Sequence, residues 1–112
     1  MAEQLELDLG PLVLPEGDAS LTIAERFDQF HDANPWIFDA LVALAEDEVR
    51  RGHERTSIDM LVHVVRWEYR RRVVSTSALR VNNDYTSRYA RLITEQRPDL
   101  AHLFETRRLR AA

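Results

Sequence analysis

Apolar residues recur at helical spacing through most of the chain after residue 20, and this pattern predicts an all-α fold. The predicted helices cover residues 21–31, 35–51, 57–72 and 84–96, and a last helix begins at Pro98. Helices of this length bury their apolar stripes by packing on one another. We therefore expect an orthogonal bundle of four to five helices.

Capping residues support these boundaries. Ser20 or Thr22 can cap the first helix, and the pair Asn34-Pro35 places asparagine at the N-cap of the second helix and proline at its first position. Gly52 is a natural C-terminal stop for that second helix. The predicted connections are accordingly short, except for the one after residue 72.

The helix over 57–72 is apolar on two faces. Its main face consists of Ile58, Leu61, Val62, Val65 and Tyr69, and its second face of Met60, Val64 and Trp67. Only a narrow strip, Asp59, His63, Arg66 and Arg70, is polar. A helix apolar around most of its girth lies at the centre of a fold, so we expect Trp67 to be buried. An exposed Trp67 would instead indicate an apolar patch for a dimer or another partner.

Two segments fall outside the helical pattern. Residues 1–19 contain prolines and glycines and form an acidic, leucine-bearing tail, which docks on its own domain or on a partner. Residues 20–112 form the single helical domain. Residues 73–81 form either a small β-hairpin or an ordered loop. With that hairpin as a wing, 35–51 and 57–72 resemble a helix–turn–helix, although the second helix is too apolar to suit a groove.

The charge is divided unequally along the chain. Residues 1–48 hold twelve acids and one base, whereas residues 49–112 hold fourteen arginines and seven acids, and the whole chain carries −4. There is no lysine. Guanidinium groups bind phosphate oxygens in a fixed bidentate geometry, so the second half favours nucleic acid. The alternative is that these arginines pair with the acids of the first half.

Composition excludes several classes of protein. The chain has no cysteine, which rules out disulfides, thiolate metal sites and a cysteine nucleophile. No apolar run approaches the roughly 20 residues needed to span a bilayer, and the acidic N-terminus is unlike a secretory signal. We expect a cytoplasmic protein. No histidine pair has the spacing of a helical zinc site, and no catalytic motif is present, so we expect neither an enzyme nor a cofactor.

The predicted nucleic-acid site centres on the helix over 84–96, with contributions from its neighbours. Asparagine and arginine read base edges, and serine commonly contacts phosphate. The candidate residues are Arg66, Arg70, Arg80, Asn82, Asn83, Ser87, Arg88 and Arg91. The alternative for this stretch is an amphipathic helix with a solvated polar face.

The tail contains a second candidate site. Gln4, Leu7 and Leu9, with Leu5 between them, resemble the hexapeptide with which bacterial proteins bind the sliding clamp of the replicative DNA polymerase. The resemblance implies that the glutamine bonds at the pocket rim and that the leucines fill an apolar pocket. That role requires a tail without stable contacts to residues 20–110. In the alternative, the leucines pack on the domain's own core.

The rest of the chain resembles small helical proteins of actinobacterial phages and prophages, which have no established activity. The resemblance rests on residues 30–35, 66–68, 82–93, 98–100 and 104–107. It implies a helical fold and a bacterial host cell. We expect a non-enzymatic accessory protein that binds DNA through its arginines. The alternative is an adaptor or inhibitor that docks on a host replication protein, such as the clamp, through its tail.

Overall fold

The computed structural model describes residues 5–15, 17, 19–72, 81 and 83–104, and these residues form an all-helical fold. The elements are α1 (Ile23–Ala33), α2 (Pro35–Arg50), α3 (Ile58–Arg72), α4 (Asn83–Gln96) and the 3₁₀ helix η1 (Pro98–Phe104). The predicted all-α fold is confirmed, and every α-helix begins and ends within two residues of its predicted bounds. The segment predicted as a hairpin lies outside the described residues, except for Val81.

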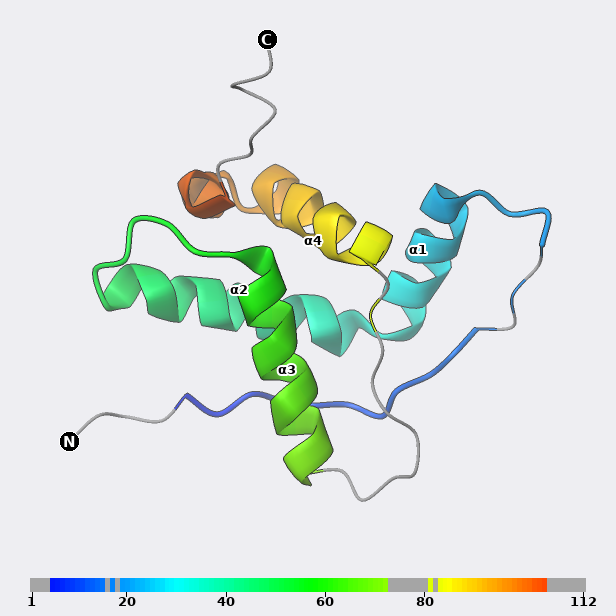
Figure 1. Cartoon of the computed structure of the whole chain (residues 1–112), viewed down its shortest axis with the longest axis horizontal. Coiled ribbons are helices and arrows are strands. Elements are labelled where there is room, and N and C mark those ends of the chain that lie inside the picture. Colours follow the sequence, from blue (N-terminus) through cyan, green and yellow to red (C-terminus); the bar gives the residue numbers. More distant parts are fainter. Residues whose placement is uncertain (1–4, 16, 18, 73–80, 82, 105–112) are drawn as a thin grey trace, which may run out of the picture.

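The helices cross one another steeply. Figure 1 shows α2 lying across the molecule, with α4 and η1 on one side of it and α3 crossing it. α1 stands beyond the N-terminal end of α4 (Figure 1). All five elements contribute to one core, whose largest fully buried side chains include Ile37, Leu41, Val65, Tyr89, Ile93 and Leu103. This arrangement is the orthogonal bundle that the apolar periodicity predicts.

Local sequence sets the ends of the first two helices. At α1, Glu25 N–H donates to Thr22 Oγ1 at 3.2 Å and Thr22 N–H donates to Glu25 Oε1 at 3.0 Å. This reciprocal pair is a capping box, and the backbone hydrogen bond from Thr22 lowers the pKa of Glu25. α2 ends before Gly52, whose φ of +86° favours glycine over any other residue.

The tail packs along the helices over residues 5–15. Leu7 is only 4% exposed and belongs to the core, while Leu5, Leu9 and Leu12 are partly buried against it. Arg72 at the end of α3 donates to Leu7 O at 2.7 Å, and Trp36 Nε1–H donates to Pro11 O at 3.1 Å. The tail therefore docks on its own domain. The condition set for clamp binding, a tail without such contacts, is not met by the described residues.

Asn34 joins the tail to the helices in a way that its predicted role does not include. It occupies the N-cap position of α2, but its side chain makes no capping hydrogen bond there. Instead, Val13 N–H donates to Asn34 Oδ1 and Asn34 Nδ2 donates to Val13 O, both at 2.7 Å. Nδ2 also donates to Phe30 O at 3.0 Å. The side-chain amide thus hydrogen-bonds both backbone groups of Val13, in the way that the backbone of a paired strand would. Asn34 is fully buried.

Gly10 allows the tail to pass close to α2. A Cβ atom added at this position would lie 2.5 Å from Trp36 Cδ1, a separation that real contacts do not show. The indole of Trp36 is held in place by Tyr69, because the two rings stack with centroids 5.7 Å apart. A side chain at position 10 would consequently displace either the tail or the Trp36–Tyr69 stack.

The buried tail leucine makes a measurable contribution to stability. We expect Leu7→Ala to lower the free energy of unfolding by about 2–5 kcal/mol, because it opens a cavity under the tail. Leu14→Ala is the matched control: Leu14 lies in the same tail but is 68% exposed, so its change should stay within about 0.5 kcal/mol. Urea denaturation of both variants makes the comparison, and equal midpoints would contradict the docked tail.

Candidate nucleic-acid interface

Helix α3 is buried on one side only. Leu61, Val62, Val65 and Tyr69 are buried, as their spacing predicts. Met60, Val64 and Trp67 are 46%, 36% and 58% exposed. The prediction that Trp67 is buried is therefore wrong. Within the described part of the chain, α3 packs on α2, α4 and the tail, and its second apolar face stays largely at the surface.

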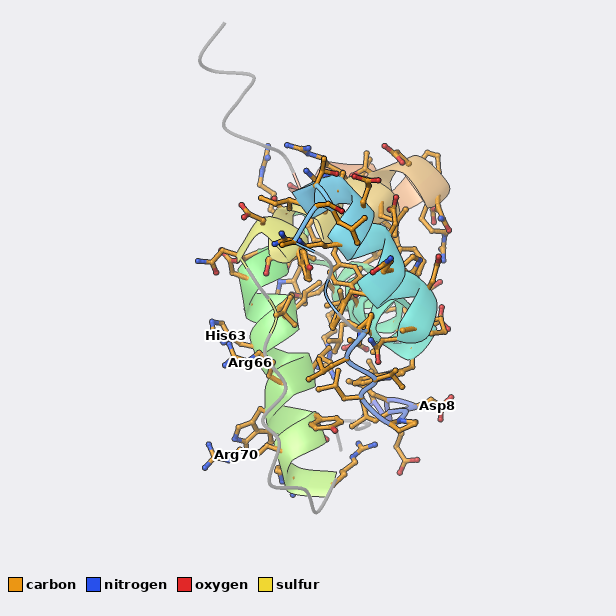
Figure 2. All side chains as sticks on the ribbon, turned by 90° about the vertical axis from the view of Figure 1, so that its right-hand side faces the viewer. Asp8, His63, Arg66 and Arg70 are labelled. Carbon is orange, nitrogen blue, oxygen red and sulfur yellow. The ribbon has the colours of Figure 1, made fainter. Side chains whose placement is uncertain are left out.

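Next to this exposed face runs the polar strip of α3, which begins with the exposed Asp59 in the first turn. Its three remaining members are basic, and we call them the basic strip: His63, Arg66 and Arg70. Figure 2 shows the three side chains projecting from one side of α3, while Asp8 of the tail lies on the opposite side of the molecule. Arg70 is exposed and has no hydrogen bond or ion pair within the described residues. Arg66 is half-buried and makes a contact of its own within the molecule. The polar strip seen in the sequence is thus a surface feature.

The two arginines that follow Arg70 serve the fold. Arg72 Nη2 lies 3.0 Å from Glu68 Oε2, and its other terminal nitrogen bonds the tail. Arg71 Nη1 lies 3.6 Å from Glu68 Oε1, and its guanidinium carbon lies 4.6 Å from the centroid of the Trp67 ring. Glu68 thereby neutralises part of the arginine run, and Arg70 is the member that faces solvent without a partner among the described residues.

A cleft adjoins the basic strip. It has a volume of about 620 Å³ and lies between the tail, α1, α3 and the start of α4. Arg26, Arg66 and Asn83 are among the residues that line it. The structure thus brings together two of the predicted nucleic-acid residues, Arg66 and Asn83. It adds Arg26, the single base of the acidic half, which sequence reasoning did not include.

The other predicted residues are less concentrated. Ser87 is exposed on α4, but its hydroxyl donates back to Asp84 O at 3.1 Å. Arg91 is exposed and Arg88 half-buried, and Asp84 and Glu95 lie within one helical turn of them on the same helix. The solvent side of α4 is therefore mixed in charge. Arg80 and Asn82 lie outside the described residues.

Internal pairing uses only part of the acidic half. Arg97 Nη2 joins α2 to the start of η1, lying 3.0 Å from Glu46 Oε2 and 2.9 Å from Asp99 Oδ2. The hydrogen bonds from Arg97 lower the pKa of the Asp99 carboxyl. Asp47 pairs within its own helical end with Arg50 and Arg51. Arg26, Arg70, Arg88 and Arg91 have no ion pair within the described residues, so the acids do not cancel the basic surface.

No metal-binding cluster accompanies these charges in the described ranges. No group of three histidine, aspartate or glutamate side chains is placed to hold a metal ion there. His31 Nδ1 and the Tyr89 hydroxyl are buried without hydrogen-bond partners, and burial raises the pKa of Tyr89. Both rings pack against Phe27 in an aromatic cluster. No helix among the described residues has both the length and the apolar character to cross a membrane.

The two tryptophans should differ sharply in their effect on stability. We expect Trp67→Ala to change the free energy of unfolding by about 1 kcal/mol, because the side chain is 58% exposed and lies outside the core, and its cation–π contact is at the surface. Trp36→Ala removes the stack on Tyr69 and the hydrogen bond to Pro11, and should cost about 2 kcal/mol or more. Thermal unfolding followed by circular dichroism measures both. A larger loss for Trp67→Ala than for Trp36→Ala would contradict the exposed position of Trp67.

Comparison with known proteins adds no family to this description. No family model, curated protein or solved structure matches the chain. The function is therefore to be inferred from the chain's own residues, above all from the basic strip, the cleft beside it and the exposed indole of Trp67.

Proposed function

We propose that this protein is a non-enzymatic accessory protein that binds nucleic acid through the basic strip of α3 and the adjoining cleft. The residues that carry the proposal are Arg66 and Arg70, together with Arg26 across the cleft. Asn83 supplies a neutral hydrogen-bonding group beside them. The proposal includes a phage-related origin for the protein, which rests on the resemblance described in the sequence analysis.

The single observation that carries it is the segregation of charge in space. His63, Arg66 and Arg70 project from one side of α3 and Asp8 lies on the opposite side (Figure 2). An anionic polymer approaching the C-terminal part of α3 meets Arg66 and Arg70, while Glu68 is already paired with Arg71 and Arg72 and the exposed Asp59 lies at the other end of the helix. Exposed arginines bind phosphate oxygens bidentately and steer polyanions electrostatically. The charge of −4 for the whole chain does not oppose such local attraction.

The size of the site limits how tightly it binds. Three arginines neutralise on the order of three phosphates, so log K should fall with log salt concentration with a slope of roughly −3. Such a slope describes weak, largely sequence-independent binding that high salt abolishes. Base-edge contacts are left to Asn83 and, outside the described residues, to Asn82, so sequence preference should be modest.

The strip can be tested with two arginines in equivalent helical positions. Arg70 is in the last turn of α3, and Arg50 is the last residue of α2, where it pairs with Asp47. We expect Arg70→Ala to weaken binding of a short labelled DNA duplex and to reduce the salt slope by roughly 1. Arg50→Ala should leave both unchanged. Fluorescence anisotropy over a salt series provides the measurement, and no binding of either duplex or single-stranded nucleic acid by the unaltered protein at low salt would refute the proposal.

Clamp binding by the tail stays a prediction, and the packing adds a condition to it. Leu7 is the central leucine of the hexapeptide, and here it is buried and its carbonyl accepts a hydrogen bond from Arg72. Gln4 lies outside the described residues. The hexapeptide would have to leave the domain before its leucines could enter another pocket. The apparent affinity of the full chain would fall by the fraction of molecules with a released tail.

A peptide comparison tests this second candidate. If the hexapeptide binds the bacterial sliding clamp, a peptide of residues 1–14 should bind more tightly than the full chain, because the peptide has no docked state to leave. Changing Gln4, Leu7 and Leu9 together to alanine in the peptide should abolish the binding. Isothermal calorimetry with purified clamp measures each affinity. No heat from the unaltered peptide at micromolar concentration would exclude clamp binding.

A further inference from the structure

Trp67 is placed unusually for a tryptophan in a small domain. Tryptophan is highly buried on average, yet this side chain is 58% exposed on α3. It is not needed to complete the core, which Leu61, Val65 and Tyr69 form from the other side of the same helix. An aromatic ring that contributes little to folding and remains in solvent indicates a surface for a ligand with an aromatic or apolar face.

The ring is held in a defined orientation. The Arg71 guanidinium carbon lies 4.6 Å from the ring centroid, and Arg71 is itself anchored by Glu68 at 3.6 Å. The guanidinium covers one face of the indole, and the exposed fraction of the side chain leaves ring surface open to solvent. The indole thus has a cation over its ring, and more than half of the residue's surface is exposed to solvent.

The basic strip lies directly beside this ring. His63 is four residues before Trp67 and Arg70 three residues after it, so both are its neighbours on the helix surface. Arg66 precedes Trp67 in sequence and connects the strip to the cleft. The strip from His63 to Arg70 spans roughly 10 Å along the helix axis. Aromatic surface and positive charge therefore occupy one side of α3, as Figure 2 shows for the three basic residues.

We propose that this side of α3 binds single-stranded nucleic acid, with an unpaired base stacked on Trp67 and adjacent phosphates held by Arg66 and Arg70. This inference rests on the proposed function and names its substrate class. Bases in a duplex are stacked on each other and offer no free face to a ring on a helix surface. Every unpaired base has a π-face, and a stacking ring beside a cationic groove is the usual means of binding single strands.

Charge favours single-stranded nucleic acid over other ligands that could bind the second apolar face of α3. Met60 and Val64 extend the apolar surface by two helical turns, which would also suit a second copy of the chain. Two copies joined through α3 would, however, bring two basic strips together, and like charges at an interface oppose association. A polyanion with aromatic bases complements both the arginines and the indole.

The experiment compares a labelled thymidine oligonucleotide, its uridine counterpart and a duplex of the same length, all with the full-length protein. We expect the single strands to bind more tightly than the duplex. Trp67→Leu should weaken single-strand binding roughly tenfold or more while leaving duplex binding within about twofold, and Trp67→Phe should retain part of the affinity. Val49→Ala is the matched control, because Val49 is an exposed apolar residue on a different helix, α2, and it should change neither.

Each outcome discriminates between the two proposals. Tighter duplex binding, or single-strand binding unaffected by Trp67→Leu, would overturn the single-strand inference and leave the proposed function standing. No binding of any nucleic acid at low salt would overturn both. Sedimentation velocity completes the set: a dimer that Trp67→Leu converts to monomer would assign the surface to self-association and refute the inference.

Discussion

The buried amide of Asn34 is the contact on which most of this structure depends. It bonds the backbone of Val13 in both directions and the carbonyl of Phe30, and thereby joins the tail, the end of α1 and the start of α2. A buried amide that lost these partners would leave polar groups of two segments unsatisfied, each at a cost of about 1–3 kcal/mol. The tail is held at this point, and its other contacts follow from it. Trp36 donates a hydrogen bond to the Pro11 carbonyl and stacks on Tyr69. Arg72 donates a hydrogen bond to the Leu7 carbonyl.

This series of contacts explains why α3 has two different sides. The tail, α2 and α4 all pack on α3, whose Leu61 and Tyr69 are buried, and they fix the helix there. On the other side, Met60, Val64 and Trp67 are exposed. Figure 1 shows the C-terminal half of α3 extending away from α4 and η1. The bundle is too small to cover a helix around its whole girth. The second apolar face of α3 and the basic strip are therefore left at the surface.

Periodicity was sufficient to predict the helices, because spacing of apolar residues and capping signals are local properties. The same periodicity did not predict the exposure of Trp67, because the spacing of apolar residues along a helix does not show whether another element covers that face. Asn34 shows a related limit. Its position before Pro35 predicts a local cap, and the N-cap position is correct, but the side chain bonds a segment twenty-one residues away. The basic strip was visible as a polar line in the sequence, whereas the participation of Arg26 depends on how α1 and α3 meet at the cleft.

The residues that stabilise the fold are different from those proposed to bind nucleic acid, so substitutions can affect one property without the other. Leu7, Asn34 and Trp36 hold the fold, and none of them belongs to the basic strip. Arg70 and Trp67 lie at the surface, so their substitution removes little buried area. Stability and the proposed binding can therefore vary independently across most of the chain. Arg66 is the exception, because it is half-buried, makes an internal contact and lines the cleft as well. A substitution there alters packing and surface charge together, so evidence about binding is cleaner at Arg70 and Trp67.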